Sequence, residues 1–330
     1  MSLVVGVDGG NSKAIALVAR RDGSIIGAAR RPGSADIYAG ESAALELLHG
    51  VVADALADAG AASADVEAAA FSLAGADWPE DLAFLRSALG RLVGLGAGPI
   101  VVNDAIGALI GAVPDGPAVV VSLGTGAATG ARAADGGTWH SSFWQVTQGA
   151  AELAQRAVAG LARSELGIEP APLLQERVLE ALGLPSVEAA VHRLTRRERG
   201  SSDSVGSVVR ALFEAADAGD PVAERIVARH GIGIGEVAAA AARRVGIDGE
   251  PYALAFGGGV TRAGASRLIA AASDAIAAAG QAPRLTPPRW EPAVGALLIG
   301  LRAASSVDGR AFASRLDGTL PPAALFDTGE

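Results

Sequence analysis

The sequence predicts an α/β protein with two halves of similar topology, and three observations lead to that class. Apolar strand-like runs alternate with segments of helical periodicity through the first half of the chain. The opening order of strand, glycine turn, strand, Asp-Gly turn and strand recurs, with the glycine turn at Gly9 in one case and at Gly124 in the other. With 330 residues, of which 50% are hydrophobic and 19% charged, the chain can bury the cores of two domains.

The first half is expected to open with three strands joined by tight turns and to continue as alternating helices and strands. Asp22-Gly23 is a strong hairpin signal between the second and third strands. Leu45, Leu48 and Leu56 are spaced to share one face of a helix. The expected strands are 3–7, 14–19, 24–29, 68–73 and 100–102, and the expected helices are 41–59, 79–93 and 105–113.

The second half repeats the opening strands and then becomes rich in helices. The expected strands are 118–123, 127–133 and 252–256, and the expected helices are 150–164, 172–182, 187–193, 205–218, 221–245, 266–279 and 292–303. The last helix is expected to pack back on the first domain, so we predict an N-terminal domain of residues 1–115 plus about 290–330 and a C-terminal domain of 116–289. Residues after Ser305 show weak periodicity and predict a mobile or partner-docking tail.

Composition excludes several classes of function. The formal net charge of −9 argues against binding to a nucleic-acid backbone. Without cysteine the chain has no thiol nucleophile, disulfide or cysteine-ligated iron–sulfur cluster. No run of ~20 apolar residues predicts a membrane helix, and no leader pattern precedes the first strand. A cytoplasmic protein with small-molecule partners is therefore expected.

Residues 8–13, with the sequence DGGNSK, are the first candidate site. Glycines let backbone amides approach phosphate oxygens, and Lys13, the only lysine, adds a compact positive charge. The motif is neither a Walker loop nor a dinucleotide-binding fingerprint, because the spacing differs and a hairpin follows. Two such hairpin tips facing each other across a cleft could hold a polyphosphate. An ordinary hairpin turn is the alternative.

Three further places could carry chemistry. Residues 257–259 are glycines between a strand and a helix, and they suit either the floor of a nucleobase site or a flexible turn. Asp104 follows a buried-looking strand, where it could accept the proton of an attacking hydroxyl or simply cap a helix. Asp36, in the loop that includes Ser34, could line a polar pocket or form a turn.

Taken together, residues 6–13 (GVDGGNSK), 103–105 (NDA), 122–126 (SLGTG) and 256–260 (FGGGV) resemble the ordered motifs of the actin-like ATPase and sugar kinase superfamily. Within it the chain most resembles the BadF/BadG/BcrA/BcrD ATPase family and, in that group, the bacterial glucosamine and N-acetylglucosamine kinases. This resemblance implies two ribonuclease-H-like domains around a cleft that closes on ATP, Mg²⁺ and a sugar. The cysteine-ligated cluster of the activator branch is excluded here.

The resemblance also assigns roles. It implies that Asp104 is the general base for a sugar 6-hydroxyl and that Asp8 helps to hold Mg²⁺ through water. The residues implied to bind ATP are Gly10, Asn11, Ser12, Lys13, Gly124, Thr125, Gly126, Gly257, Gly258 and Gly259. Those implied to bind the sugar are Ser34, Asp36, Asn103, Asp104, Thr147, Gln148 and Gly149.

One departure from the family pattern bears on the substrate. Where N-acetylhexosamine kinases commonly show Gly-Asp-Glu-Gly, this chain has VTQG at residues 146–149. Asp36 stands near the place of an Asn that usually recognises the N-acetyl group, and a carboxylate favours an ammonium over an acetamide. We therefore expect glucosamine as the acceptor. An N-acetylglucosamine or other hexosamine kinase and a nucleotide-dependent switch or regulator are the alternatives, and a homodimer is compatible with the small-residue helix faces.

Overall fold

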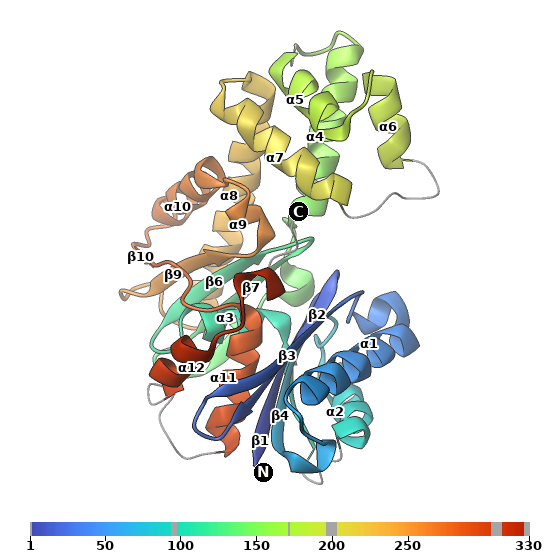
Figure 1. The fold of residues 1–330 in the computed structure, drawn as a ribbon. Coiled ribbons are helices and arrows are strands. Elements are labelled where there is room, and N and C mark those ends of the chain that lie inside the picture. Colours follow the sequence, from blue (N-terminus) through green and yellow to red (C-terminus); the bar gives the residue numbers. More distant parts are fainter. Residues whose placement is uncertain (1, 94–97, 171, 196–202, 305–311, 327–330) are drawn as a thin grey trace.

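Two five-stranded sheets with the same strand order organise the fold (Figure 1). The computed structural model describes residues 2–93, 98–170, 172–195, 203–304 and 312–326. The first sheet has the order β3 (Ile25–Pro32), β2 (Lys13–Arg20), β1 (Leu3–Gly9), β4 (Val66–Leu73), β5 (Ile100–Asn103). The second, in matching direction, has the order β8 (Thr138–His140), β7 (Ala127–Arg132), β6 (Ala118–Leu123), β9 (Ala253–Gly257), β10 (Arg284–Leu285). In each sheet the first three strands are antiparallel and the others parallel to the central one. The predicted repetition of topology is therefore confirmed.

The bounds of the elements follow the predicted alternation of strands and helices closely. The first sheet comprises β1 (Leu3–Gly9), β2 (Lys13–Arg20), β3 (Ile25–Pro32), β4 (Val66–Leu73) and β5 (Ile100–Asn103), and the second comprises β6 (Ala118–Leu123), β7 (Ala127–Arg132), β8 (Thr138–His140), β9 (Ala253–Gly257) and β10 (Arg284–Leu285). The helices are α1 (Ile37–Asp58), α2 (Pro79–Val93), α3 (Asp104–Ala112), α4 (Ala150–Glu165), α5 (Pro172–Leu182), α6 (Val187–Thr195), α7 (Asp203–Asp217), α8 (Pro221–Arg244), α9 (Gly259–Arg262), α10 (Ser266–Ala278), α11 (Pro292–Ala304) and α12 (Ala313–Thr319). Short 3₁₀ turns lie at Ser63–Asp65, Ser142–Trp144 and Ala323–Leu325.

The first sheet is covered on both faces. β1 is buried along its length apart from Asp8, as its nearly continuous apolar sequence requires of a central strand. Helices α1 and α2 contribute to the core on one face, whereas α11 and the following C-terminal segment pack on the other (Figure 1). The last long helix thus returns to the first sheet.

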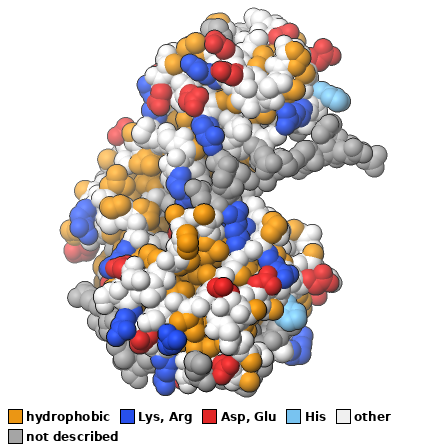
Figure 2. Space-filling model, viewed as in Figure 1, with side chains coloured by type: hydrophobic (Ala, Val, Ile, Leu, Met, Phe, Trp, Pro, Cys, Tyr) orange, Lys and Arg blue, Asp and Glu red, His pale blue; other side chains and the backbone are white. Residues whose placement is uncertain are grey.

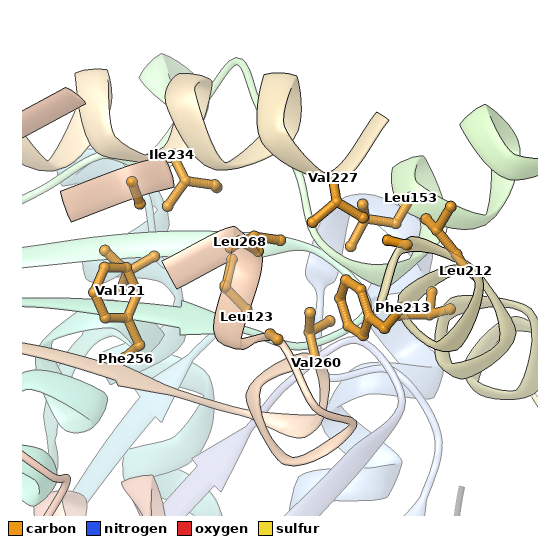
Figure 3. Close-up of a cluster of buried hydrophobic side chains, with 14 of the residues drawn as sticks. Val121, Leu123, Leu153, Leu212, Phe213, Val227, Ile234, Phe256, Val260 and Leu268 are labelled. Carbon is orange, nitrogen blue, oxygen red and sulfur yellow. The ribbon is translucent and has the colours of Figure 1, made fainter. Parts of the chain in front are cut away.

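The second sheet packs against α8 and α10 on one face and α3 on the other. Figure 3 shows Val121 and Phe256 of the sheet near Leu268 of α10, with Leu212 of α7 further along the same apolar cluster. On the opposite face, α3 joins β6 and β9 in a smaller cluster that includes Leu109. Helix α3 therefore lies between the two sheets.

Several glycines serve close packing rather than turns. A Cβ on Gly295 of α11 would lie 1.9 Å from the carbonyl oxygen of Gly107 in α3, and one on Gly130 of β7 would lie 2.5 Å from that of Ala105. Small residues at these crossings let backbones approach to a distance that any side chain would prevent. This packing fixes the N-terminus of α3 relative to both sheets.

Helices α4, α5, α6 and α7 gather beyond the second sheet and form the end of the molecule furthest from α1 and α2 (Figure 1). Their amphipathic sequences bury Leu153, Leu174 and Leu212 in the same core as the sheet. Among the helices that the structure describes, none combines the length and apolarity needed to cross a bilayer.

The structure differs from the sequence prediction in a few elements. Helix α1 spans Ile37–Asp58, but Gly40 has non-helical backbone angles (φ 162°, ψ 101°). A first turn, capped by Asp36 through the Tyr38 amide, therefore precedes a continuous helix that begins near the predicted residue 41. β10 and α9 were not predicted, since two- and four-residue elements carry no periodicity. A mobile tail is wrong for residues 312–326, where Phe312, Leu316 and Phe326 are buried on the first sheet; the rest of the predicted tail falls on 305–311 and 327–330, outside the described residues.

Candidate active site

The turn between β1 and β2, residues 10–12, is the first of two hairpin tips that face one cavity. The tip is held by backbone hydrogen bonds, since the Gly10 amide donates to the Lys13 carbonyl at 3.0 Å and the Gly10 carbonyl accepts from Ala35 at 2.9 Å. A Cβ on Gly9 would lie 2.7 Å from the side chains of Ala35 and Leu73. Glycine at position 9 therefore lets β1 reach the cavity between these neighbours.

The second tip, residues 124–126, joins β6 and β7. Its carbonyls are bound by the first turn of α4, with Ala150 donating to Gly124 at 2.8 Å and Ala151 donating to Thr125 at 3.1 Å. Gly149 caps α4 against this turn, and a Cβ there would lie 2.1 Å from the carbonyl oxygen of Gly126. The start of α4 thus fixes the second tip.

The two tips meet across a cavity of about 270 Å³. The hydroxyl oxygens of Ser12 and Thr125 lie 3.1 Å apart, within hydrogen-bonding distance. The two halves of the chain therefore touch each other at the tips. Figure 2 shows the molecule hollowed between the helices at one end and the body that carries the first sheet. Of the residues predicted to bind ATP, the cavity is lined by Gly10, Asn11, Ser12, Lys13, Gly124, Thr125, Gly126, Gly258 and Gly259.

Partly buried charges converge on this cavity. Asp8 and Asp104 both line it, and so does Glu291, which precedes α11. Burial, followed by repulsion from Asp104, raises the pKa of Asp8 to about 7, although Lys13 lowers it. Burial, followed by repulsion from Arg30, holds the pKa of Lys13 below its ordinary value. The ammonium of Lys13 donates to the carbonyl of Phe326, so the C-terminal segment reaches the same cavity.

Asp104 starts α3 where β5 ends. Asn103 caps the helix by accepting from the Ala105 amide at 3.0 Å, which leaves the Asp104 carboxylate free of the capping role that the sequence left open. Burial, then repulsion from Asp77, raises the pKa of Asp104 to about 6. A carboxylate with that pKa can accept a proton near neutral pH.

The third glycine motif forms another wall of the cavity. Gly258 has a φ of 95°, and a Cβ there would lie 2.4 Å from the Leu123 carbonyl oxygen, so glycine is required both for the turn and for contact with the second tip. Gly257 ends β9 and is not among the lining residues. Val205 and Val209 of α7 add an apolar surface opposite. That combination suits a flat, largely apolar group.

The residues predicted to bind sugar are placed unevenly. Gln148 lines the cavity and its Oε1 accepts from the Ala127 amide at 3.3 Å. Thr147 instead packs against Gly233 of α8, and Gly149 is buried behind the second tip. Ser34 accepts from the Asp36 amide at 3.2 Å, in the loop before α1. Asp36 and Asn103 are not lining residues of this cavity, but Asp36 is close enough to Asp104 to raise its pKa.

Three residues in or beside the site were not predicted from the sequence: Asp77, Glu291 and Arg262. Asp77 follows β4, and its Oδ1 accepts from Asn103 at 2.8 Å, beside Asp104. Glu291 and Arg262 line the cavity and form an ion pair at 3.2 Å. The position of Asp77 after an apolar parallel strand was a usable signal, since such strand ends meet at one edge. Glu291 and Arg262 lie in no recognisable pattern.

The donor set suits Mg²⁺, which prefers carboxylate and phosphate oxygens and keeps several waters. Asp8, Asp104 and Glu291 line the cavity, and the pKa of Asp8 is raised by burial first and then by repulsion from Asp104 and Glu291. Within the described ranges, no group of three or more His, Asp or Glu side chains forms a ready-made metal site. An ion here would therefore depend on phosphate and water ligands as well.

Comparisons with known proteins agree with this architecture. Residues 5–300 match the family model of the BadF/BadG/BcrA/BcrD ATPase family. No curated protein matches the chain significantly.

Among solved structures, an inferred N-acetylglucosamine kinase from Chromobacterium violaceum has 23% identity and a TM-score of 0.67, over 90% of this chain and 98% of that one. An inferred N-acetylglucosamine kinase from Porphyromonas gingivalis has 18% identity and a TM-score of 0.63, over 93% and 100%. A ROK family glucokinase from Streptomyces griseus, solved with glucose and AMPPNP, has 19% identity and a TM-score of 0.61, over 91% and 99%. At these identities the likeness shows a shared fold.

Proposed function

The chain belongs to the BadF/BadG/BcrA/BcrD ATPase family, and from that premise we propose that it is an ATP-dependent hexosamine kinase. The preferred acceptor is D-glucosamine, and the products are glucosamine 6-phosphate and ADP. The observation that carries the proposal is one cavity lined by both hairpin tips and by the partly buried Asp104. The fold shared with inferred N-acetylglucosamine kinases and with a glucokinase supports the sugar class.

In the proposed reaction, Asp104 accepts the proton of the sugar 6-hydroxyl while that oxygen attacks the γ-phosphorus. The bond between the γ-phosphorus and the β,γ-bridging oxygen breaks, and ADP leaves with the electron pair. Positioning matters more than an extreme pKa in such a transfer. With a pKa of about 6, Asp104 is mostly ionised at neutral pH, so turnover should rise as pH increases through about 6.

The two tips would hold the phosphates between them. Backbone amides of residues 10–12 and 124–126 would donate to the β- and γ-phosphates, with the Lys13 ammonium adding charge. Gly258 and Gly259 would face the adenosine part beside Val205 and Val209. Mg²⁺, when bound to the phosphates, neutralises their charge, and Asp8 would hold it through water.

The sugar would lie on the side of Asp104 that Asp36 faces. We propose that Asp36 contributes to the preference for an amine, since one of its carboxylate oxygens caps α1 and the other has no partner among the described residues. N-acetylglucosamine is the second candidate acceptor, favoured by the descriptions of two structural neighbours.

Coupled ATP turnover with Mg²⁺ tests the proposal, with glucosamine, N-acetylglucosamine, glucose or no sugar present. We expect at least tenfold higher kcat/KM for glucosamine, with a product whose mass and fragmentation locate the phosphate at oxygen 6. Faster transfer to N-acetylglucosamine would replace the acceptor but keep the enzyme class. ATP hydrolysis that is indifferent to every sugar would instead indicate a nucleotide-dependent switch or regulator.

Asp104→Asn tests the proposed base in the same assay. The substitution keeps the size and the helix start but removes the proton acceptor, so kcat should fall by about 10²- to 10⁴-fold. Nucleotide affinity, measured by calorimetry, should change little. Near-normal turnover would remove Asp104 from this role.

A further inference from the structure

Beside Asp104, the two halves of the chain meet a second time, outside the cavity that the hairpin tips line. The Ser142 hydroxyl, from the turn after β8, donates to Oδ1 of Asp77, from the loop after β4. The Asn103 side-chain amide donates to the same oxygen at 2.8 Å. The other oxygen, Oδ2, has no hydrogen-bond partner among the residues that the structure describes. Asp77 is thus held firmly by one oxygen and open at the other.

Three aromatic residues lie next to this contact, since Trp78 follows Asp77 in the chain, Phe143 follows Ser142, and Tyr38 meets the Phe143 ring; we call Tyr38, Trp78 and Phe143 the aromatic wall. The Trp78 and Phe143 rings stack at 6.0 Å with an angle of 14° between planes, and the Tyr38 and Phe143 rings meet edge to face at 5.7 Å. Phe143 comes from the second half of the chain and the other two come from the first. In a chain with only 4% aromatic residues, this grouping leaves 42–62% of each side chain exposed.

Hydrogen bonds to Asp81 hold two residues of the aromatic wall in place. Asp81, which is buried, accepts from the Tyr38 hydroxyl and from the Trp78 amide, each at 2.8 Å. Ser142 presents its hydroxyl from a backbone with a φ of 44°, the only positive value at a non-glycine residue of the described chain. Such backbone strain persists where surrounding contacts impose it, commonly at functional sites.

The charges around the aromatic wall are unbalanced. Asp36 and Asp77 both raise the pKa of Asp104 by repulsion, after the larger effect of burial, and burial raises the pKa of Asp77 as well. His140 interacts electrostatically with Asp77, but burial lowers the pKa of His140 and so disfavours its cationic form. Within the described part of the chain, no ion pair reaches any of these three carboxylates. A bound cation would relieve the repulsion.

We propose that the aromatic wall and Oδ2 of Asp77 together form the subsite that selects a protonated amine on the acceptor. This inference rests on the proposed kinase function and names the structure that would set its substrate preference. Aromatic faces attract ammonium groups, and a carboxylate adds a charge-assisted hydrogen bond. A hydroxyl or an acetamide at the same carbon can also donate a hydrogen bond to the carboxylate, but it carries no charge and therefore gains neither the ion pair nor the attraction to the aromatic faces.

The test compares glucosamine with glucose, which differ at one carbon, in wild-type protein and in Asp77→Asn. We expect the ratio of their kcat/KM values to fall at least tenfold in the variant. Calorimetry with a non-hydrolysable ATP analogue gives a second measure of the preference, the ratio of the dissociation constants of the two sugars. This measure does not depend on turnover. A ratio that stays within twofold, or an equal loss for both sugars, would overturn the proposal.

Three further variants sharpen the result. Phe143→Leu keeps an apolar side chain but removes the ring, and should lower the ratio about threefold. Ser142→Ala removes a donor while leaving the charge of Asp77, and should leave the ratio within twofold. Asp36→Asn retains a good helix cap and removes the neighbouring carboxylate, and its effect should be smaller than that of Asp77→Asn. A larger effect at Asp36 would assign selection to that residue instead.

Failure of this proposal can be separated from failure of the proposed function. If wild-type protein phosphorylates no sugar, the kinase function falls, and the ratio of dissociation constants still decides whether the subsite selects an amine. If the protein phosphorylates glucosamine while Asp77→Asn keeps the wild-type ratio, only the subsite falls. Failure to bind either sugar would overturn both.

Discussion

The two hairpin tips occupy matching places in two sheets of the same strand order, yet they differ in charge. The strand pairing ends at Gly9 and Ala14 in the first sheet and at Leu123 and Ala127 in the second. The residue before each end is Asp8 in the first sheet and Ser122 in the second, and both line the cavity. A repeated backbone thus frames the cavity, whereas the ionisable residues next to the tips, Asp8 and Lys13, belong to the first copy.

Among the variants that test this difference between the tips, the largest effect is expected at Asp8. Asp8→Asn should lower kcat by about 100-fold, as removal of a residue that orients a metal's ligands commonly does. Ser122→Ala, at the matching position, should change kcat less than threefold. Steady-state kinetics with saturating ATP and sugar measures both variants, and equal losses would show that the two strands contribute alike.

Asp8→Asn also has an effect on stability with a definite sign. Because the pKa of Asp8 is raised from 3.8 to about 7, the folded protein favours the protonated form, and the stability from this group is lost as pH rises through about 7. Asn cannot ionise and avoids that loss. The melting temperature of the variant should therefore exceed that of wild type at pH 8, and the difference should shrink toward pH 4.

The second tip should be sensitive to backbone crowding. Gly149→Ala places a methyl group 2.1 Å from a tip carbonyl and should destabilise the protein by about 1–3 kcal/mol, with at least tenfold weaker ATP binding. Gly124→Ala is the matched control, because a Cβ there meets nothing within 4 Å. Its melting temperature should stay near that of wild type while its methyl group reduces ATP affinity. Thermal unfolding and calorimetry separate the two effects.

The smallest effect is expected where the tips touch each other. The Ser12 and Thr125 hydroxyls are exposed, and an exposed hydrogen bond adds little net free energy. Ser12→Ala should change KM for ATP less than threefold. A tenfold change would show that this contact, rather than the backbone amides, holds the tips together around the nucleotide.

Much of the fold could be predicted because its signals are local. Apolar strands ending in glycine turns, and helices with apolar residues on one face, define the duplicated sheets directly from the sequence. The repeated topology also predicts that both tips face one cavity. In the structure Gly10 of the first tip and Gly126 of the second both line the same cavity. The return of α11 to the first sheet was also predicted.

The remaining parts of the site depend on packing between distant segments. Asp77 approaches Asp104 because β4 and β5 pair in parallel and both end at that edge. Glu291 reaches the cavity because α11 crosses α3 through Gly107 and Gly295, which read as helix-breaking residues in isolation. Neither residue belongs to a sequence motif. The sequence therefore gives no indication of Glu291, and it indicates Asp77 only by its place after an apolar strand.

The crossing of α11 over β1 also bears on how the chain is made. Gly6 at the centre of the first strand lies directly against Leu297, where a Cβ would be 2.3 Å from the Leu297 backbone. On the ribosome, β1 emerges well before this helix, so one face of the first sheet is without its cover while the residues between them are synthesised. The second sheet and its helices form from one continuous stretch. The first sheet is therefore completed only after the strands of the second sheet have been translated.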